Sequence, residues 1–224
     1  YLLKNGINKI DLALVTHLHQ DHYGGIASLA RLMPVNKLAI YEGNFLKEDL
    51  LMADTGLDKE DLLYLTAGDR ITIDKNVFIE VLHPERKCTE TYREIMEDEE
   101  DENLSSLVVR VSYKGIFVLV TGDMRFEGEK LVMDSKLPQN AGALKADILK
   151  VGHHGSRFST SSDFVVAVDP QVAIIQVGKN NFGHPHRDTI EMISKKGIMI
   201  FRNDDQGAVI LNIKENEVKI HTML

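Results

Sequence analysis

Residues 16–25 read THLHQDHYGG and place three histidines and an aspartate within six positions, in the order H-x-H-x-D-H. The six residues before them, IDLALV at 10–15, form a short apolar run that is typical of a buried strand. After the Gly-Gly pair, the apolar residues at 26, 29, 30 and 33 have the spacing of a helix. The ligand-type side chains are therefore expected on a loop at the carboxyl end of a strand, where α/β folds place their chemistry.

The spacing of these side chains suits metal binding. In an extended segment, side chains two positions apart point the same way, so His17 and His19 can hold one metal ion. As the chain turns into the helix, Asp21 and His22 point to the other side and can hold a second ion. Imidazole and carboxylate are ligands for zinc, and also for manganese or iron. The alternative is that these histidines only cap the helix or lie on the surface, but the density of ligand-type residues favours a metal site.

Composition limits the classes of function that fit. With 224 residues, 43% of them hydrophobic and 27% charged, the chain is interpreted as one globular domain, 1–224. No apolar run approaches the roughly 20 residues needed to span a bilayer, so no membrane segment is expected in this chain. The net charge of −8 argues against a broad face for duplex DNA, although bound metal ions could still hold a phosphate. The single Cys88 makes a disulfide framework or a thiolate zinc site implausible.

An alternation of strands and helices is predicted along the rest of the chain. The predicted strands are 37–41, 62–65, 70–73, 77–82, 104–113, 116–121, 146–151, 172–177, 198–202, 207–213 and 218–222. Helices are predicted over 45–55, 127–135, 159–168 and 187–196. Residues 85–103, with the acidic run 97–102, are interpreted as an inserted solvated loop, and a further cation-binding loop is the alternative. No targeting signal is found, so the compartment stays open.

Three more of these strands end in ligand-type residues. Asp123 closes an apolar strand, and beside the histidine cluster it is a candidate for a carboxylate that bridges two metals, although alone it could be a turn former or a helix cap. His153 and His154 follow the next strand and are flanked by glycines, which allow a ligand to approach the backbone closely. His184 stands between a glycine and a proline after the strand at 172–177. The recurrence of such residues at four strand ends predicts one shared site.

The segment after His154 also has features of an anion site. Ser156, Arg157, Ser159 and Thr160 place hydroxyls and a guanidinium at the start of a predicted helix, where backbone N–H groups favour negative charge. We expect these four residues to bind substrate, although a serine-rich helix cap explains them equally well.

These residues together resemble the metallo-β-lactamase fold superfamily, through H-x-H-x-D-H at 17–22 and Thr-Gly-Asp at 121–123. The chain is more closely similar to the lactamase-like domain of the ComEC/Rec2 competence proteins and their stand-alone relatives. NLSSLV at 103–108, KVGHHGS at 150–156 and NNFGHP at 180–185 carry this likeness. The resemblance covers essentially the whole chain and implies an α/β fold, the four-layer αββα sandwich, with a dinuclear metal site at one edge of its two sheets.

Two departures from the family pattern have consequences. The first β-hairpin of the family, with its D-x-G-Q-G-D motif, is absent, so we expect the chain to lack its first strands and to expose a sheet edge or apolar surface. Either a second copy or the missing N-terminal segment would cover that edge. The histidine of the family's P-G-H-T segment is also absent, and the acidic insertion and Asn103 stand in its place. His83 is the nearest imidazole and is interpreted as a strand-end residue.

The resemblance implies metal-dependent hydrolysis, and a phosphodiester is the expected substrate, single-stranded DNA being one case. His17 and His19 would hold one ion, Asp21, His22 and His154 the other, and Asp123 would bridge them. Two ions, zinc or manganese, would polarise the substrate and supply hydroxide at neutral pH. Asp21, His153 and His184 are the candidate catalytic residues, with the two histidines protonating the leaving oxygen. The alternatives are a phosphorylcholine esterase and a non-catalytic domain that binds nucleic acid or a partner.

Overall fold

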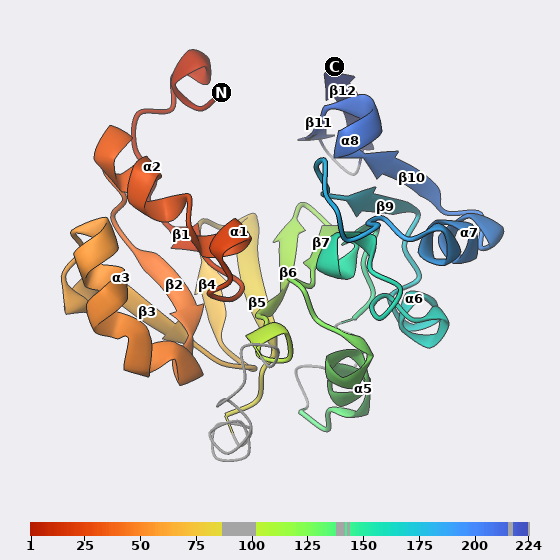
Figure 1. The fold of residues 1–224 in the computed structure, drawn as a ribbon, viewed down its shortest axis with the longest axis horizontal. Helices are drawn as coiled ribbons and strands as arrows, with labels where there is room; N and C mark the ends of the chain where they lie inside the picture. Colours follow the sequence, from red (N-terminus) through yellow and green to blue (C-terminus); the bar gives the residue numbers. More distant parts are fainter. Residues whose placement is uncertain (87–101, 138–141, 143, 215–216, 224) are drawn as a thin grey trace.

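The computed structural model describes residues 1–86, 102–137, 142, 144–214 and 217–223. The chain builds two sheets that pack face to face, with helices on both outer sides (Figure 1). Most of the acidic insertion, 87–101, lies outside the described residues. No helix in the described part of the chain is long and apolar enough to cross a membrane.

The smaller sheet comes from the first third of the chain. Its strands β1 (Ala13–Leu14), β2 (Leu38–Tyr41) and β3 (Leu62–Leu65) are parallel and lie in the order β1-β2-β3. Helices α2 (Ile26–Leu32) and α3 (Glu48–Thr55) connect them and cover the outer face (Figure 1). Parallel strands need such crossovers, because a tight hairpin can join only antiparallel neighbours. The one-turn helix α1 (Gln20–Tyr23) follows β1 directly.

The larger sheet has the strand order β10-β9-β8-β7-β6-β5-β4. Strands β4 to β7 are antiparallel neighbours, while β7 to β10 run parallel. The strands are β4 (Arg70–Thr72), β5 (Val77–His83), β6 (Val108–Tyr113), β7 (Ile116–Val120), β8 (Ile148–Lys150), β9 (Val172–Ile175) and β10 (Met199–Arg202). The predicted turn between β6 and β7 is confirmed, since Lys114 and Gly115 both have positive φ, as a tight hairpin requires.

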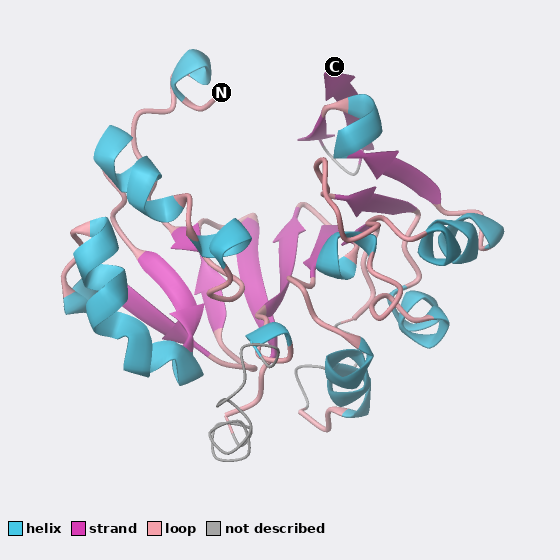
Figure 2. Ribbon diagram, in the orientation of Figure 1, coloured by secondary structure: helices cyan, strands magenta, loops and turns pink. Residues whose placement is uncertain are grey.

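Helices α5 (Phe126–Asp134), α6 (Ser162–Val168) and α7 (Arg187–Lys195) cover the outer face of the larger sheet (Figure 2). The short α8 (Asn203–Gln206), which the sequence pattern missed, leads to a separate hairpin of β11 (Ala208–Lys214) and β12 (Glu217–Met223). The remaining short helices are η1 (Leu3–Asn5), η2 (Glu42–Lys47), η3 (Lys59–Asp61) and η6 (Gly152–Gly155).

Buried apolar side chains separate the four layers. Tyr41 and Leu65 of the smaller sheet pack against Val81 and Val109 of the larger one and form the core between the sheets. Leu51 of α3 packs on the outer face of the smaller sheet, and the helices α5 to α7 pack on that of the larger one. These contacts confirm the αββα sandwich. Strand β1 pairs only with β2 among the described residues, so its other edge is unpaired, as predicted.

His83 at the end of β5 gives the fold a testable pH dependence. The side chain is buried, its Nε2 lies 2.9 Å from the Leu104 carbonyl oxygen, and burial lowers its pKa from 6.5 to about 4. The unfolded chain therefore binds a proton first as the pH falls, and stability present above pH 6.5 is lost toward pH 4. A shift of this size corresponds to roughly 3 kcal/mol.

We expect the His83→Gln variant to lose less stability than the wild type between neutral and mildly acidic pH. Urea unfolding of both proteins in the same buffers measures the difference, and the comparison subtracts the contribution of the other histidines. Equal pH slopes for the two proteins would contradict a buried neutral His83.

Candidate metal centre

Strand topology brings the four predicted loops together. The strands β7, β8 and β9 are parallel, so their carboxyl ends meet at one edge of the larger sheet and present Asp123, the His153-His154 pair and His184. The carboxyl end of β1 in the smaller sheet brings residues 17–22 to the same place. The backbone N–H of Leu107 donates to the Thr16 carbonyl oxygen at 2.8 Å and ties the two sheets together at this edge.

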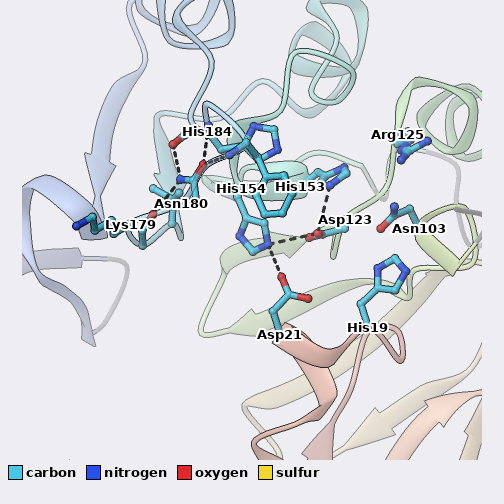
Figure 3. A pocket seen from close by; sticks show the side chains of 13 residues that line it. His19, Asp21, Asn103, Asp123, Arg125, His153, His154, Lys179, Asn180 and His184 are labelled. Carbon is cyan, nitrogen blue, oxygen red and sulfur yellow. Dashed lines mark hydrogen bonds and ion pairs between the residues drawn. The ribbon is translucent and has the colours of Figure 1, made fainter. Parts of the chain in front are cut away.

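Two carboxylates and two imidazoles form the centre of the site. Ligand atoms of Asp21, His22, Asp123 and His154 all lie within 4.8 Å of one another. Asp123 faces both imidazoles: its Oδ1 lies 3.2 Å from Nε2 of His22, and its Oδ2 lies 3.3 Å from Nε2 of His154. The same His154 nitrogen is 3.2 Å from Asp21 Oδ2 (Figure 3). Asp123 thus takes the central position that the sequence predicted for a shared carboxylate.

His17 and His19 lie beside this cluster as a pair. Nε2 of His17 is 3.0 Å from Nδ1 of His19, and the His17 ring centroid is 4.1 Å from that of His22. His17 is fully buried, and burial lowers its pKa to about 3. The imidazole is therefore neutral at pH 7, which is the protonation state a metal ligand needs. The structure thus brings all six predicted metal ligands into one region.

The orientation of His154 is fixed by the backbone. Its Nδ1 lies 2.7 Å from the Gln176 carbonyl oxygen, so Nδ1–H donates and Nε2 points to the carboxylates. Such a backbone partner is the usual device that selects the metal-binding nitrogen of a histidine. The hydrogen bond to Asp123 raises the pKa of His154, because a proton on Nε2 would lie between the two carboxylates. A bound cation would take the place of such a proton.

The loop Gly122–Asp123 is held in one conformation. Gly122 has φ +52°, and a Cβ there would lie 2.9 Å from Ser106 Cβ and 3.0 Å from Thr16 Cβ. The Asp123 N–H donates to Ser106 Oγ at 3.1 Å, and Lys150 Nζ donates to the Gly122 carbonyl oxygen at 2.8 Å. Burial would raise the pKa of Asp123, but the imidazoles of His154 and His22 that face its two oxygens outweigh it, and the pKa is well below its usual range.

Buried polar atoms without a hydrogen bond indicate that the residues fit a metal ion. His22 Nε2 and Asp123 Oδ1 are both buried and face each other at 3.2 Å, yet neither makes a hydrogen bond with acceptable geometry. Leaving such groups unsatisfied costs about 1–3 kcal/mol each, a cost that a shared cation would remove. Nitrogen and carboxylate ligands without sulfur suit zinc or manganese. The residues present therefore fit the metal centre that the sequence predicted.

His153 and His184 lie next to each other on the wall of the site. Their ring centroids are 5.5 Å apart, and Nε2 of His153 lies 3.8 Å from Asp123 Oδ2. Burial lowers the pKa of His153 to about 4 and also lowers the pKa of His184. Both rings are thus neutral at pH 7. A neutral ring still has one N–H to donate, but it is a poor source of a full proton.

The anion site predicted at the start of α6 is occupied by a carboxylate of the protein itself. The Glu129 carboxylate from α5 accepts hydrogen bonds from the backbone N–H groups of Thr160 and Ser161. Ser159 Oγ donates to the Gly152 carbonyl oxygen at 2.8 Å, and Thr160 Oγ1 accepts from the Gly152 N–H at 3.0 Å. This placement corrects the substrate-binding role predicted for Ser156, Ser159 and Thr160. The Ser159 and Thr160 hydroxyls hold the histidine loop from behind, and the buried Ser156 Oγ accepts from the Phe158 N–H at 3.2 Å.

Arg157 is exposed and lies over the Phe158 ring, at 4.9 Å from its centroid, outside the residues that line the site. The phosphate clamp predicted for Arg157 is therefore also misplaced. Two other cations, Arg125 and Lys179, line the site instead.

The ligands open into a cavity of about 430 Å³. Figure 3 shows Lys179 and Asn180 on one side of the ligand cluster, and Asn103 and Arg125 on the other. Asn103 is only 3% exposed, and its Oδ1 makes no hydrogen bond. The position of Asn103 could have been predicted from the sequence. Because β6 and β7 form a hairpin, the residues before β6 lie at the same sheet edge as Asp123, which follows β7. Arg125, two positions after Asp123, could have been included for the same reason.

Comparison with known proteins agrees with this architecture. Residues 1–179 match the Metallo-beta-lactamase superfamily, and the chain belongs to this family.

Among individual proteins, the chain is 34% identical over 215 residues to ComE operon protein 3 of Bacillus subtilis, covering 93% of this chain and 25% of that protein. It is 27% identical over 219 residues to the competence protein ComA of Neisseria gonorrhoeae, covering 96% of this chain and 27% of that protein. The chain thus spans about a quarter of the length of these relatives. The resemblance to competence proteins is confirmed.

Solved structures show the same fold at low sequence identity. A variant of CmlA β-hydroxylase has a TM-score of 0.54 at 13% identity, covering 87% of this chain and 43% of that one. Zn²⁺-bound PqqB from Methylobacterium extorquens has a TM-score of 0.53 at 10% identity, covering 86% of this chain and 71% of that one. These likenesses concern the fold alone.

Proposed function

We propose that the protein is a metal-dependent hydrolase that cleaves phosphodiesters through a dinuclear centre. The observation that carries this proposal is the convergence of Asp21, His22, Asp123 and His154 within 4.8 Å, in a cavity that Arg125 and Lys179 also line. Carboxylates and imidazoles bind the metal, and the two cations provide charge for an anionic substrate.

His17 and His19 would hold one ion, with Asp21, His22 and His154 at the other and Asp123 between them. When bound, two such ions supply Lewis-acid polarisation of the phosphoryl group and an activated water. The buried Asp123 keeps its negative charge because its pKa is depressed, and Lys150 Nζ lies 3.6 Å from its Oδ1. Lys150 thereby holds the carboxylate in position and partly balances its charge.

The other polar groups of the cavity act on the substrate. Arg125 and Lys179 attract and orient a phosphate from opposite sides of the ligand cluster. His153 and His184 are neutral at pH 7 because burial lowers their pKa values. They donate hydrogen bonds to a phosphoryl or leaving oxygen, and complete transfer of a proton from them is disfavoured. Asp21 is exposed beside His154 and can orient a water molecule.

Two observations favour a nucleic acid as the natural phosphodiester. The relatives include one named as a competence protein and one named as a recombination protein, which supports a DNA-related role for this domain. A choline headgroup, by contrast, calls for an aromatic cage. Among the described residues that line the cavity, Phe182 is the only phenylalanine, tyrosine or tryptophan. A phosphorylcholine esterase is therefore the weaker candidate.

Asn103 lines the cavity together with His19 and can influence which metal ion binds there. The buried amide oxygen is available as an oxygen ligand or as an acceptor for a bound water, in the place where the family pattern has a histidine. Oxygen ligands suit manganese better than imidazoles do. We expect Asn103→His to raise zinc affinity more than manganese affinity, and Asn103→Ala to weaken the binding of the first ion. Titration of the metal-free variants with each ion measures both effects, and unchanged affinities would place Asn103 outside the metal site.

A nuclease assay tests the proposed function. Purified protein is stripped of metal, reloaded with manganese or zinc, and given single-stranded and double-stranded DNA, bis-p-nitrophenyl phosphate and p-nitrophenyl phosphorylcholine. We expect metal-dependent cleavage of the first substrates and less of the last. Cleavage of the choline ester alone would reverse this order, and tight metal-independent DNA binding without turnover would indicate a non-catalytic binding domain.

A further inference from the structure

Phe182 is an exposed aromatic side chain at the proposed active site. It lines the same cavity as Asp21, Asp123 and His154, and it is 83% exposed. Single exposed apolar residues are common on protein surfaces and need no function. Phe182 differs because its loop is built to hold it in place.

The side-chain amide of Asn180 fixes this loop. Its Nδ2 donates to the carbonyl oxygens of Gly178, at 2.9 Å, and His184, at 2.7 Å. Its Oδ1 accepts from the N–H groups of Phe182, at 3.0 Å, and His184, at 3.1 Å. All four hydrogen bonds of the amide are thus made to the backbone of the loop between β9 and α7. The exposed ring is therefore carried on an ordered backbone and loses little freedom when it binds a ligand.

One face of the Phe182 ring is already stacked. Its centroid lies 6.1 Å from that of His184, with an angle of 23° between the planes. The high exposure of the ring leaves room for a second planar group. Lys179, on the same loop, adds a positive charge to the cavity that Phe182 lines, and the proposed metal ligands line it as well. A planar, apolar group attached to a phosphate fits this arrangement.

We propose that Phe182 is a stacking platform for the base next to the scissile phosphate, so that the site takes single-stranded nucleic acid. This inference rests on the proposed phosphodiesterase function and specifies its substrate class. Stacking on an aromatic ring needs a base that is free of its partner strand, and it tolerates any sequence because every base has a π-face. In a duplex interior the bases are stacked on each other and cannot reach the ring.

The chain contains no tryptophan, which permits a direct optical test. In a Phe182→Trp variant the new indole is the only one, so its fluorescence reports on this position alone. We expect quenching by a phosphorothioate oligothymidylate strand, which resists hydrolysis, and none by the same strand with abasic sugars. Quenching by both strands, or by neither, would overturn the stacking role.

Phe182→Ala provides the affinity test. With metal-loaded protein and a fluorescein-labelled strand, anisotropy should show roughly ten- to a hundred-fold weaker binding than wild type, the range expected for one stacked base. The abasic strand should bind both proteins equally. Phe158→Ala is the matched control, because Phe158 is 56% exposed but lies outside the cavity. Equal affinity of wild type and Phe182→Ala for the normal strand would overturn the proposal.

These readouts separate this inference from the proposed function. Turnover of bis-p-nitrophenyl phosphate by the wild type tests hydrolysis, and anisotropy and fluorescence test stacking without any turnover. If the wild type hydrolyses the diester but Phe182→Ala binds the strand as tightly as wild type, the hydrolase function stands and the stacking role of Phe182 is rejected. If quenching depends on the bases but no hydrolysis occurs, Phe182 stacks bases in a domain that binds nucleic acid without cleaving it. If Phe182→Ala impairs cleavage of p-nitrophenyl phosphorylcholine and the strand does not bind, the ring serves choline and the proposal is wrong.

Discussion

Replacing Asp123 by asparagine is expected to abolish phosphodiester hydrolysis while the protein stays folded. Asparagine keeps the size of the side chain, but it removes the charge that faces His22 from one oxygen and His154 from the other. Loss of a partner around a metal ligand alone costs about 10- to 100-fold in affinity or activity. Removal of the central carboxylate itself should exceed that range. Steady-state hydrolysis of bis-p-nitrophenyl phosphate and metal content measured on the same samples provide the readout.

Asp169→Asn is the matched control for this substitution. Asp169 lies at the end of α6 in the left-handed region, φ +56°, which asparagine also tolerates. Within the part of the chain that the structure describes, its carboxylate pairs with Lys145 at the surface. The control should retain activity and metal content. Circular dichroism and thermal unfolding check that both variants are folded. An Asp123→Asn protein with more than a tenth of wild-type activity would contradict the shared-carboxylate arrangement.

The second large effect is expected at Gly122. Alanine there would need φ +52° and would place its Cβ 2.9 Å from Ser106 Cβ and 3.0 Å from Thr16 Cβ. The left-handed backbone costs about 1 kcal/mol and the overlap about 1–3 kcal/mol more. Because Asp123 follows directly, relief of the overlap also moves the carboxylate away from the histidines. We expect Gly122→Ala to lower the free energy of unfolding by about 2–4 kcal/mol and to lose most activity even where it remains folded.

Gly56→Ala separates the two contributions. Gly56 has φ +71° and ends α3, but nothing lies within 4 Å of a Cβ built there. It should lose only about 1 kcal/mol, the cost of the backbone conformation, and keep full activity. Urea unfolding and hydrolysis assays on both variants test this difference. If the two variants lose equal stability and Gly122→Ala stays active, close packing around Asp123 does not control the site.

Local sequence patterns predicted most of the strands and the residues that converge at one sheet edge, and the family resemblance supplied the αββα sandwich. Alternating apolar runs set the strands, and the polar residues at their carboxyl ends had to meet once β7, β8 and β9 were parallel. The H-x-H-x-D-H motif was informative because its side chains act within one short loop. Asp123 could be identified because a glycine and a buried strand precede it.

The errors concern residues whose partners are distant in sequence. The serine-rich segment after His154 has the composition of an anion site, and only the packing of α5 against α6 reveals that Glu129 already satisfies it. The choice between Arg157 and Arg125 depends in the same way on which guanidinium the tertiary fold turns into the cavity. Local spacing contains no information about either, because both depend on contacts between separate elements.

The most direct test of a dinuclear hydrolase is to count bound metal and measure turnover on one preparation. The metal-free protein is titrated with manganese or zinc, the bound ions are measured by elemental analysis after gel filtration, and bis-p-nitrophenyl phosphate hydrolysis is followed on the same fractions. Two ions per chain, with activity that appears as the sites fill, is the predicted result. A chain that binds no ion, or that fills its sites and hydrolyses neither this diester nor single-stranded DNA, would contradict the proposed function.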